Sequence, residues 1–321
     1  MTGQGVIFSG GWARWPAIVV SALVLLGVAG CSGSADSTSQ PPEARIAVIG
    51  GTHVNDAIFQ RDLIETEFTV ETPVGESPTI QYAQYDGIPF YYIHMHGGGN
   101  WLGTWAALYQ LGVEEAVGGA TAGAINTDME VYDYVIPHDF IDMNYNRPRS
   151  IPDEVYRDPD NIPLPRYKPA IDTDIRGILL SETRKAINGD EQYSDIEVHD
   201  GGVVMQDRSG RFETVAEIEM MDQWGGDLVT HNIASEMVYS RMLGINYANM
   251  AVISNPAEGK GDWDFSLMKK VYPRVNPLSL DIILASLPRI AELKGKPRVD
   301  EGLINHPEMT SKEQGSADEE D

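Results

Sequence analysis

The sequence predicts an α/β fold: a single domain with a mostly parallel, twisted central sheet flanked by helices. Short runs rich in Ile and Val, such as RIAVIGGT at 45–52 and INYANMAVISN at 245–255, stop at glycines or polar residues. Buried strands that lead into tight turns have this pattern. Segments with apolar residues at helical spacing separate the runs. Strands that alternate with helices are typical of a mostly parallel sheet.

The expected elements follow in order along the chain. They are a strand at 45–52, a strand in 88–99, a helix through Leu108, a turn at Gly112, a strand ending at Gly123, one strand in 134–143, a helix before the glycines at 225–226, a strand at 227–230, a further helix, a strand at 245–255 and a helix at 277–293. Ligands of such folds bind beyond the carboxyl ends of the strands. The candidate site residues are those that terminate the runs: Thr52, His96, Thr121, His231, Asn232 and Asn255.

Composition excludes some classes of partner. The formal net charge of −25 disfavours nucleic acid and anionic lipid. An acidic surface is also common in salt-adapted proteins, so the charge identifies no partner. The seven histidines show no H-E-x-x-H spacing, and the acidic segment DEVYRDPDN resembles a solvated loop more than a calcium site. No metal is expected.

The two ends of the chain differ from the domain between them. Residues 1–31 combine Arg14, a short apolar run and the sequence Val28-Ala29-Gly30-Cys31, which resembles the lipobox of a bacterial lipoprotein signal peptide. Lipid attachment at Cys31 would place the protein outside the cell membrane, exported and lipid-anchored; an uncleaved anchor or an ordinary secretory signal is the alternative. We expect a flexible tether at 32–44, the folded domain at 45–295, and an acidic, disordered tail at 296–321.

Seven motifs resemble one enzyme family. The motifs occur in the order and at the approximate spacing found in trimeric purine nucleoside and methylthioadenosine phosphorylases. They are VIGGT, HMHGGG, GATAGAI, VIPHDFID…NRP, RFETVAEI, GGDLVTHNIASE and VISNPAEG. The resemblance covers roughly 46–287. It implies that the protein cleaves the N-glycosidic bond of a purine nucleoside with inorganic phosphate as co-substrate. The products would be a free base and a sugar 1-phosphate, with no cofactor and a homotrimeric assembly.

The resemblance assigns four residues to phosphate: Thr52, His96, Thr121 and Asn232. Their setting suits an anion, because glycine-rich turns let backbone N–H groups approach phosphate oxygens. The alternatives are an ordinary tight turn at Thr52 and a structural loop histidine at His96. His94 has no assigned role.

The resemblance assigns Phe212, Glu213 and Asn255 to the purine. An aromatic ring offers a stacking surface, and a carboxylate accepts a hydrogen bond from the ring N1–H of hypoxanthine or guanine. An asparagine amide can donate to a 6-oxo group, so 6-oxopurine nucleosides are favoured over methylthioadenosine. Asn255 and His96 are the expected catalytic residues. The alternatives are a helix-start carboxylate at Glu213 and a turn residue at Asn255.

Two departures from the family pattern concern the expected site. Met95 stands where the methylthioadenosine branch has an arginine for phosphate, which lowers the expected anion affinity unless another cation, such as Arg211, replaces it. His231 replaces a sugar-site methionine and is the candidate sugar contact. The leading hypothesis is a phosphorylase; a nucleoside hydrolase on the same fold and a non-catalytic nucleoside-binding lipoprotein are the alternatives.

Overall fold

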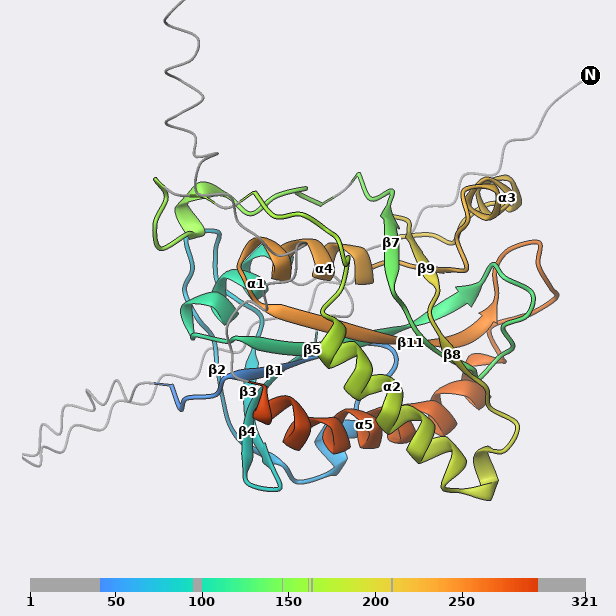
Figure 1. The fold of residues 1–321 in the computed structure, drawn as a ribbon, viewed down its shortest axis with the longest axis horizontal. Helices are drawn as coiled ribbons and strands as arrows, with labels where there is room; N and C mark the ends of the chain where they lie inside the picture. The colour runs from blue at the N-terminus through green and yellow to red at the C-terminus, as the bar shows by residue number, and fades with distance from the viewer. Residues whose placement is uncertain are drawn as a thin grey trace, which may run out of the picture. The chain divides into compact units, whose positions relative to one another are not determined.

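A mixed sheet of 11 strands forms the centre of the protein in the computed structural model (Figure 1). The structure describes residues 41–94, 100–145, 147–160, 162, 164–208 and 210–293. The strands are β1 (Ile46–Gly50), β2 (Ile64–Phe68), β3 (Ile80–Tyr85), β4 (Ile88–His94), β5 (Glu115–Ala124), β6 (Tyr134–Ile136), β7 (Asp139–Asp142), β8 (Val198–Asp200), β9 (Val203–Gln206), β10 (Leu228–Thr230) and β11 (Asn246–Pro256).

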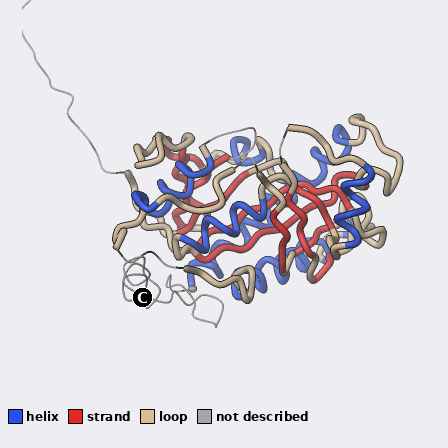
Figure 2. Tube along the Cα trace, turned by 90° about the horizontal axis from the view of Figure 1, so that it is seen from above, coloured by secondary structure: helices blue, strands red, loops and turns tan. Residues whose placement is uncertain are grey.

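The described residues form five α-helices. They are α1 (Trp101–Gln110), α2 (Thr173–Asn188), α3 (Val215–Gln223), α4 (Ile233–Met242) and α5 (Met268–Glu292). Figure 1 shows α1 and α4 on one face and α2 and α5 on the other, with α3 apart from both layers. Figure 2 shows the strands in the interior and long loops at the periphery. Helices on both faces explain why the central strands are almost continuously apolar.

The pairing of β5 creates the gap that holds the candidate site. One edge of β5 pairs with β11 along its whole length, in parallel. Its other edge pairs with β1 in parallel only as far as Gly118, and with β10 in antiparallel fashion only from Gly123. Neither β1 nor β10 pairs with the intervening residues 119–122. The sheet is therefore open along this stretch of β5.

Side-chain caps define where several helices begin. The Asn100 side chain accepts a hydrogen bond from the backbone N–H of Gly103 at the start of α1. Thr214 and Glu217 form a reciprocal capping box at the start of α3. Such caps satisfy backbone N–H groups that have no partner within the helix. They fix the residues at which α1 and α3 begin.

The α/β prediction is confirmed, with differences in detail. The single strand expected in 134–143 is wrong: Pro137, which has no N–H for a strand ladder, separates β6 from β7, and the two strands pair with different neighbours. Helix α5 begins at Met268 instead of 277 and contains three prolines. The boundaries predicted for the signal peptide, tether and tail lie wholly or largely outside the described residues and stay predictions.

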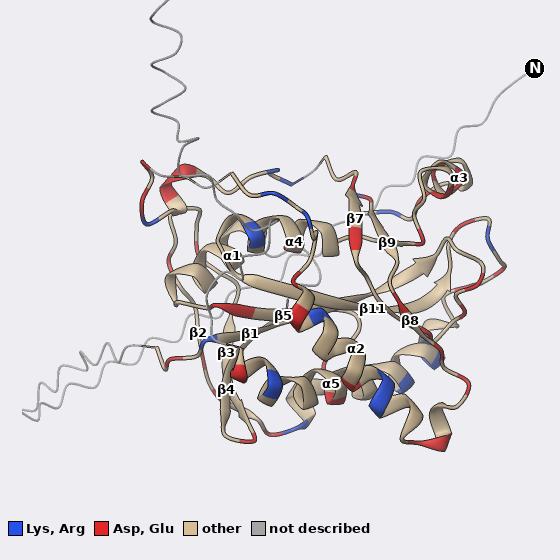
Figure 3. Ribbon diagram, viewed as in Figure 1, with Lys and Arg blue, Asp and Glu red and all other residues tan. Residues whose placement is uncertain are grey.

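The described part of the chain is one compact unit that begins at Pro41. None of its helices is both long and apolar enough to span a lipid bilayer. Acidic residues, red in Figure 3, are spread over many loops and helices instead of gathering on one element.

Candidate active site

A cavity of about 720 Å³ lies at the gap beside β5. The ends of β1, β10 and β11 and the loop before α3 also contribute to its wall. This volume is in the range of small-molecule sites in proteins. Most of the residues selected from sequence line it: Thr52, Thr121, Phe212, Glu213, His231, Asn232 and Asn255. Their roles in binding stay predictions, and His96 and Cys31 lie outside the described residues.

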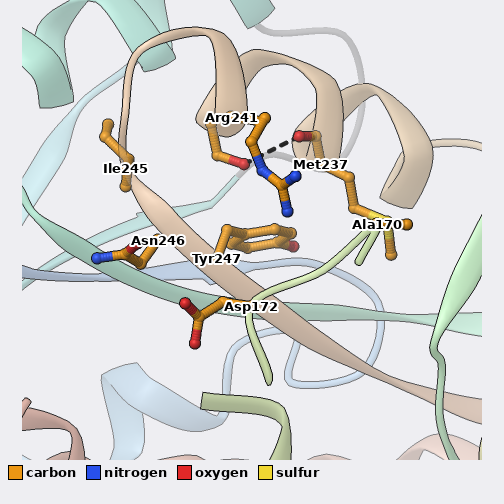
Figure 4. Close-up of a pocket in the computed structure, with 8 residues that line it drawn as sticks. Ala170, Asp172, Met237, Arg241, Ile245, Asn246 and Tyr247 are labelled. Carbon is orange, nitrogen blue, oxygen red and sulfur yellow. Dashed lines mark hydrogen bonds between the residues drawn. The ribbon is translucent and has the colours of Figure 1, made fainter. Parts of the chain in front are cut away.

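A second hollow, between α4, β11 and the segment before α2, is too small for an organic ligand (Figure 4). Its volume of about 10 Å³ is no more than the space of one water molecule. In its wall, Ser240 Oγ donates a hydrogen bond to the backbone carbonyl of Met237 at 3.2 Å. The larger cavity is therefore the candidate active site.

Two threonines meet at one end of the large cavity. The hydroxyl of Thr121 donates to Thr52 Oγ1 at 2.8 Å, and the Thr121 backbone N–H donates to the same oxygen at 3.1 Å. The turn before Thr52 needs glycine, because a Cβ at Gly50 would collide with the hydroxyl of Tyr92. Close packing beneath the turn thus presents both hydroxyls to the cavity.

Asn232, directly before the first turn of α4, also lines the cavity. Its amide Nδ2 donates to Glu236 Oε1 at 2.8 Å, and the hydroxyl of Tyr247 donates to the other carboxylate oxygen. Burial raises the pKa of Glu236 to about 7, while the hydrogen bonds from Tyr247 and Asn232 lower it. Glu236 therefore fixes the orientation of the Asn232 amide.

Thr230 and Arg147 also line the cavity, although neither was selected from the sequence. The buried Thr230 hydroxyl has no hydrogen-bond partner among the described residues. The Arg147 guanidinium carbon lies 3.7 Å from the ring centroid of Trp101, and Nη1 donates to Ser235 Oγ at 3.2 Å. Burial is the main cause that lowers the pKa of Arg147. Arg147 belongs to the NRP segment of the motifs quoted above. That segment was the sequence feature that could have identified Arg147 as a site residue.

Glu213, from the loop before α3, also lines the cavity and is buried. Burial raises its pKa to about 7, with further increases from Asp207 and Glu217. Oε1 of Glu213 lies 4.0 Å from Nδ1 of His231. Glu213 directly precedes Thr214, the N-cap of α3, and the carboxylate of the capping box is Glu217.

Phe212 is 42% exposed and belongs to an aromatic cluster. Its ring centroid lies 5.3 Å from that of Trp263 and 5.8 Å from that of Phe265, in edge-to-face arrangements. His231 is next, at 6.5 Å. Trp263 and Phe265 come from the loop between β11 and α5, and their approach to Phe212 was not evident from sequence.

Asn255 follows an irregularity in β11. The register between β11 and β5 shifts between Ile253 and Asn255, as a bulge would shift it. Ser254 Oγ donates to Asn255 Oδ1 at 2.8 Å, and Asn255 Nδ2 donates to the carbonyl of Pro256 at 2.8 Å. The bulge and these two bonds hold the amide at the cavity wall.

Arg211 does not supply the substitute cation that the sequence suggested. Both of its Nη atoms donate to the carboxylate of Glu217, at 2.8 and 2.6 Å, and Arg211 does not contribute to the cavity wall. The guanidinium is thus engaged in a surface ion pair beside α3.

Comparison with known proteins identifies the family. The model of the phosphorylase superfamily matches residues 46–288. The chain belongs to the phosphorylase superfamily. It is 32% identical over 222 residues to a probable 6-oxopurine nucleoside phosphorylase of Archaeoglobus fulgidus, covering 67% of this chain and 83% of the relative. It is 31% identical over 224 residues to the 6-oxopurine nucleoside phosphorylase of Pyrococcus furiosus, covering 67% and 80%.

Solved structures show the same superfamily fold. A methylthioadenosine phosphorylase of Schistosoma mansoni in complex with adenine superimposes with a TM-score of 0.67 at 18% identity. The superposition covers 78% of this chain and 93% of that structure. At this identity the likeness establishes the fold of this superfamily member and leaves its substrate to the site residues.

Proposed function

We propose that the protein catalyses phosphorolysis of purine nucleosides, with 6-oxopurines preferred, to a free base and a sugar 1-phosphate. One observation carries the proposal: the same cavity is lined by one group of hydroxyls with an amide, from Thr52, Thr121 and Asn232, and by a second group, the buried Glu213 carboxylate with the Asn255 amide. The 6-oxopurine nucleoside phosphorylases among the relatives support this substrate class.

The chemistry requires two different groups of residues, one at the phosphate and sugar and one at the base. Cleavage of the ribosyl–purine bond develops positive charge on the sugar and negative charge on the base. An anion held beneath the sugar stabilises the first, and hydrogen-bond donors at the base stabilise the second. Thr52, Thr121 and Asn232 are the proposed phosphate contacts, with His96 added by resemblance. Holding phosphate in line with the breaking bond removes much of the entropic barrier.

The proposed base contacts favour a 6-oxopurine. In its ionised form Glu213 accepts a hydrogen bond from N1–H, a group that hypoxanthine and guanine carry and adenine lacks. The Asn255 amide is proposed to donate to the purine as negative charge develops, which makes it the proposed catalytic residue at this end. His231 is the proposed sugar contact, and Phe212 the proposed stacking surface.

We further propose a homotrimer that is exported and anchored through a lipid on Cys31, using inorganic phosphate as co-substrate and no cofactor. The sequence resemblance and the lipobox support these features. Light scattering of the purified chain tests the trimer. Intact mass measurement tests the lipid, which Cys31→Ser should remove together with membrane association.

The decisive experiment measures cleavage by the full chain, purified in a mild detergent. Inosine, guanosine and methylthioadenosine are each incubated with and without phosphate, and base and sugar products are quantified. We expect phosphate-dependent release of hypoxanthine and guanine with ribose 1-phosphate. Release of free ribose without phosphate would instead indicate a hydrolase, and nucleoside binding without turnover a capture protein; either result would overturn the proposal.

A further inference from the structure

We propose that Arg147 is the cation of the phosphate subsite and that its guanidinium contacts the phosphate oxygens. The inference rests on the proposed function and names a residue of the same site. Among the described residues that line the cavity, Arg147 is the only Arg or Lys. An anionic co-substrate that enters a cavity loses part of its hydration, and a positive charge offsets that loss.

Arg147 contacts the helix turn that follows Asn232, one of the proposed phosphate contacts. It donates to Ser235, which is in the first turn of α4. Asn232, the residue before α4, belongs to the same turn, and the helix rises only about 1.5 Å per residue. The guanidinium is thus beside the wall that carries Asn232, at the positive end of the α4 dipole. The base-side carboxylate Glu213 belongs to another element, the loop before α3.

The guanidinium is held in place without being neutralised. In the described part of the chain, no carboxylate lies within ion-pair distance of Arg147. Its single hydrogen-bond partner there is the neutral hydroxyl of Ser235. Its flat face rests on Trp101, a contact that favours the charged form and restricts the rotamer. Arg211, in contrast, already has both Nη atoms bonded to Glu217.

The charges around Arg147 leave it able to bind an anion. Glu236 and Asp142 act on it electrostatically from beyond ion-pair distance. Glu236 is already occupied by Asn232 and Tyr247, and Asp142 is exposed. A guanidinium has five N–H groups, so most of them are available for a bidentate contact with phosphate.

The test separates phosphate binding from nucleoside binding. With wild-type phosphorolysis established first, Arg147→Gln should raise the KM for phosphate by about 10- to 100-fold, as expected for a lost charge-assisted bond. The KM for inosine should change by less than about twofold. Arg147→Lys, which keeps the charge but not the bidentate geometry, should give an intermediate phosphate KM. Arg149→Gln, at an exposed position two residues away, is the matched control and should leave both constants unchanged.

A second measurement uses the wild-type chain, so it does not depend on the folding of a variant. Phenylglyoxal modifies accessible guanidinium groups, and peptide mass spectrometry reports the modification at each arginine. Inorganic phosphate should slow modification of Arg147 and leave Arg149 unaffected, whereas chloride at equal ionic strength should protect neither. An unchanged phosphate KM in Arg147→Gln, equal rises in both KM values, or absent protection would overturn the inference. Absence of wild-type phosphorolysis would overturn the proposed function itself.

Discussion

The two ends of the cavity differ in how their polar groups are held. At the Thr52–Thr121 end, side chains bond to one another and to buried partners, and the turn is packed against Tyr92. At the Glu213 end, the carboxylate lies beside exposed aromatic rings: Phe212 is 42% and Phe265 68% exposed.

The contrast follows from the elements that form each end. Strand ends and the first turn of α4 build the phosphate end, whereas the base end combines Asn255 of β11 with two loops, before α3 and before α5. Sheet-borne groups are fixed before a ligand arrives, which suits a small symmetrical anion. Loop-borne aromatic rings can adjust to a larger, flat ligand. We therefore expect changes at the base end to affect chemistry and selectivity, and changes at the Thr52–Thr121 end to affect phosphate affinity alone.

The largest expected effect is that of Asn255→Ala. Removing a donor that stabilises developing charge typically lowers kcat by about 10²- to 10³-fold. Steady-state kinetics with inosine should show this fall while the KM for phosphate stays nearly unchanged. Asn188→Ala, at an exposed residue that ends α2, is the control. A kcat within about threefold of wild type would remove Asn255 from the catalytic role.

Glu213→Gln ranks second. Loss of a hydrogen bond to a charged acceptor costs about 1.5–3 kcal/mol, so kcat/KM for inosine should fall by about 10- to 100-fold. Activity on methylthioadenosine should fall less, because adenine has no N1–H to donate. Glu217→Gln alters a carboxylate of the α3 cap and should affect stability without changing this ratio. Equal losses on both substrates would contradict the assigned selectivity.

The pH dependence ranks third. The folded-state pKa of Glu213 is about 7, raised by burial, so the ionised, accepting form increases between pH 6 and 8. We expect kcat/KM for inosine to rise by up to about tenfold over this range. Phosphate also titrates in this pH range. The test is therefore the part of the rise in kcat/KM that Glu213→Gln abolishes. Identical pH profiles for wild type and variant would exclude Glu213 as the titrating group.

The same pKa has the opposite effect on stability. A carboxyl whose folded pKa exceeds its unfolded value of 4.5 binds its proton more tightly in the folded state. The resulting stabilisation is complete below pH 4.5 and is lost as pH rises through about 7. Thermal unfolding of wild type and Glu213→Gln over this window therefore gives an independent measure of the shift.

Thr121→Val should have the smallest effect. It removes one neutral hydroxyl, whose hydrogen bond is worth about 0.5–1.5 kcal/mol. The KM for phosphate should rise by about two- to tenfold, whereas the selectivity for inosine should be preserved. Thr66→Val, on the exposed β2, is the matched control. A fall in inosine selectivity in Thr121→Val would contradict the division of the cavity into two ends.

The sequence predicted the long buried strands and missed several short or partly exposed ones. β1, β5 and β11 are long runs of small and branched apolar residues, which only buried strands require. β2 alternates with exposed Glu and Thr, and α2 is largely polar, so neither stands out from loop sequence. Local patterns thus identify central elements better than peripheral ones.

The site was predictable where residues end strands and not where loops meet. Thr52, Thr121 and Asn255 follow from strand order alone. Contacts of Arg147 with Trp101, and of Trp263 with Phe212, join segments separated by tens of residues, and no local pattern encodes them. Methionine at position 95 indicated a missing cation, yet sequence selected Arg211, whereas the cavity wall contains Arg147.

Asn276 in α5 has a consequence for how the protein matures. Its amide donates to the carbonyl of Thr52 at 2.7 Å, and its side-chain oxygen accepts from Asn55 at 3.0 Å. The turn that carries Thr52 is among the first parts of the domain to be synthesised, and Asn276, which holds the turn, is among the last. A ribosome must therefore release almost the entire chain before that turn is secured. Chains that end before Asn276 would lack both hydrogen bonds to this turn.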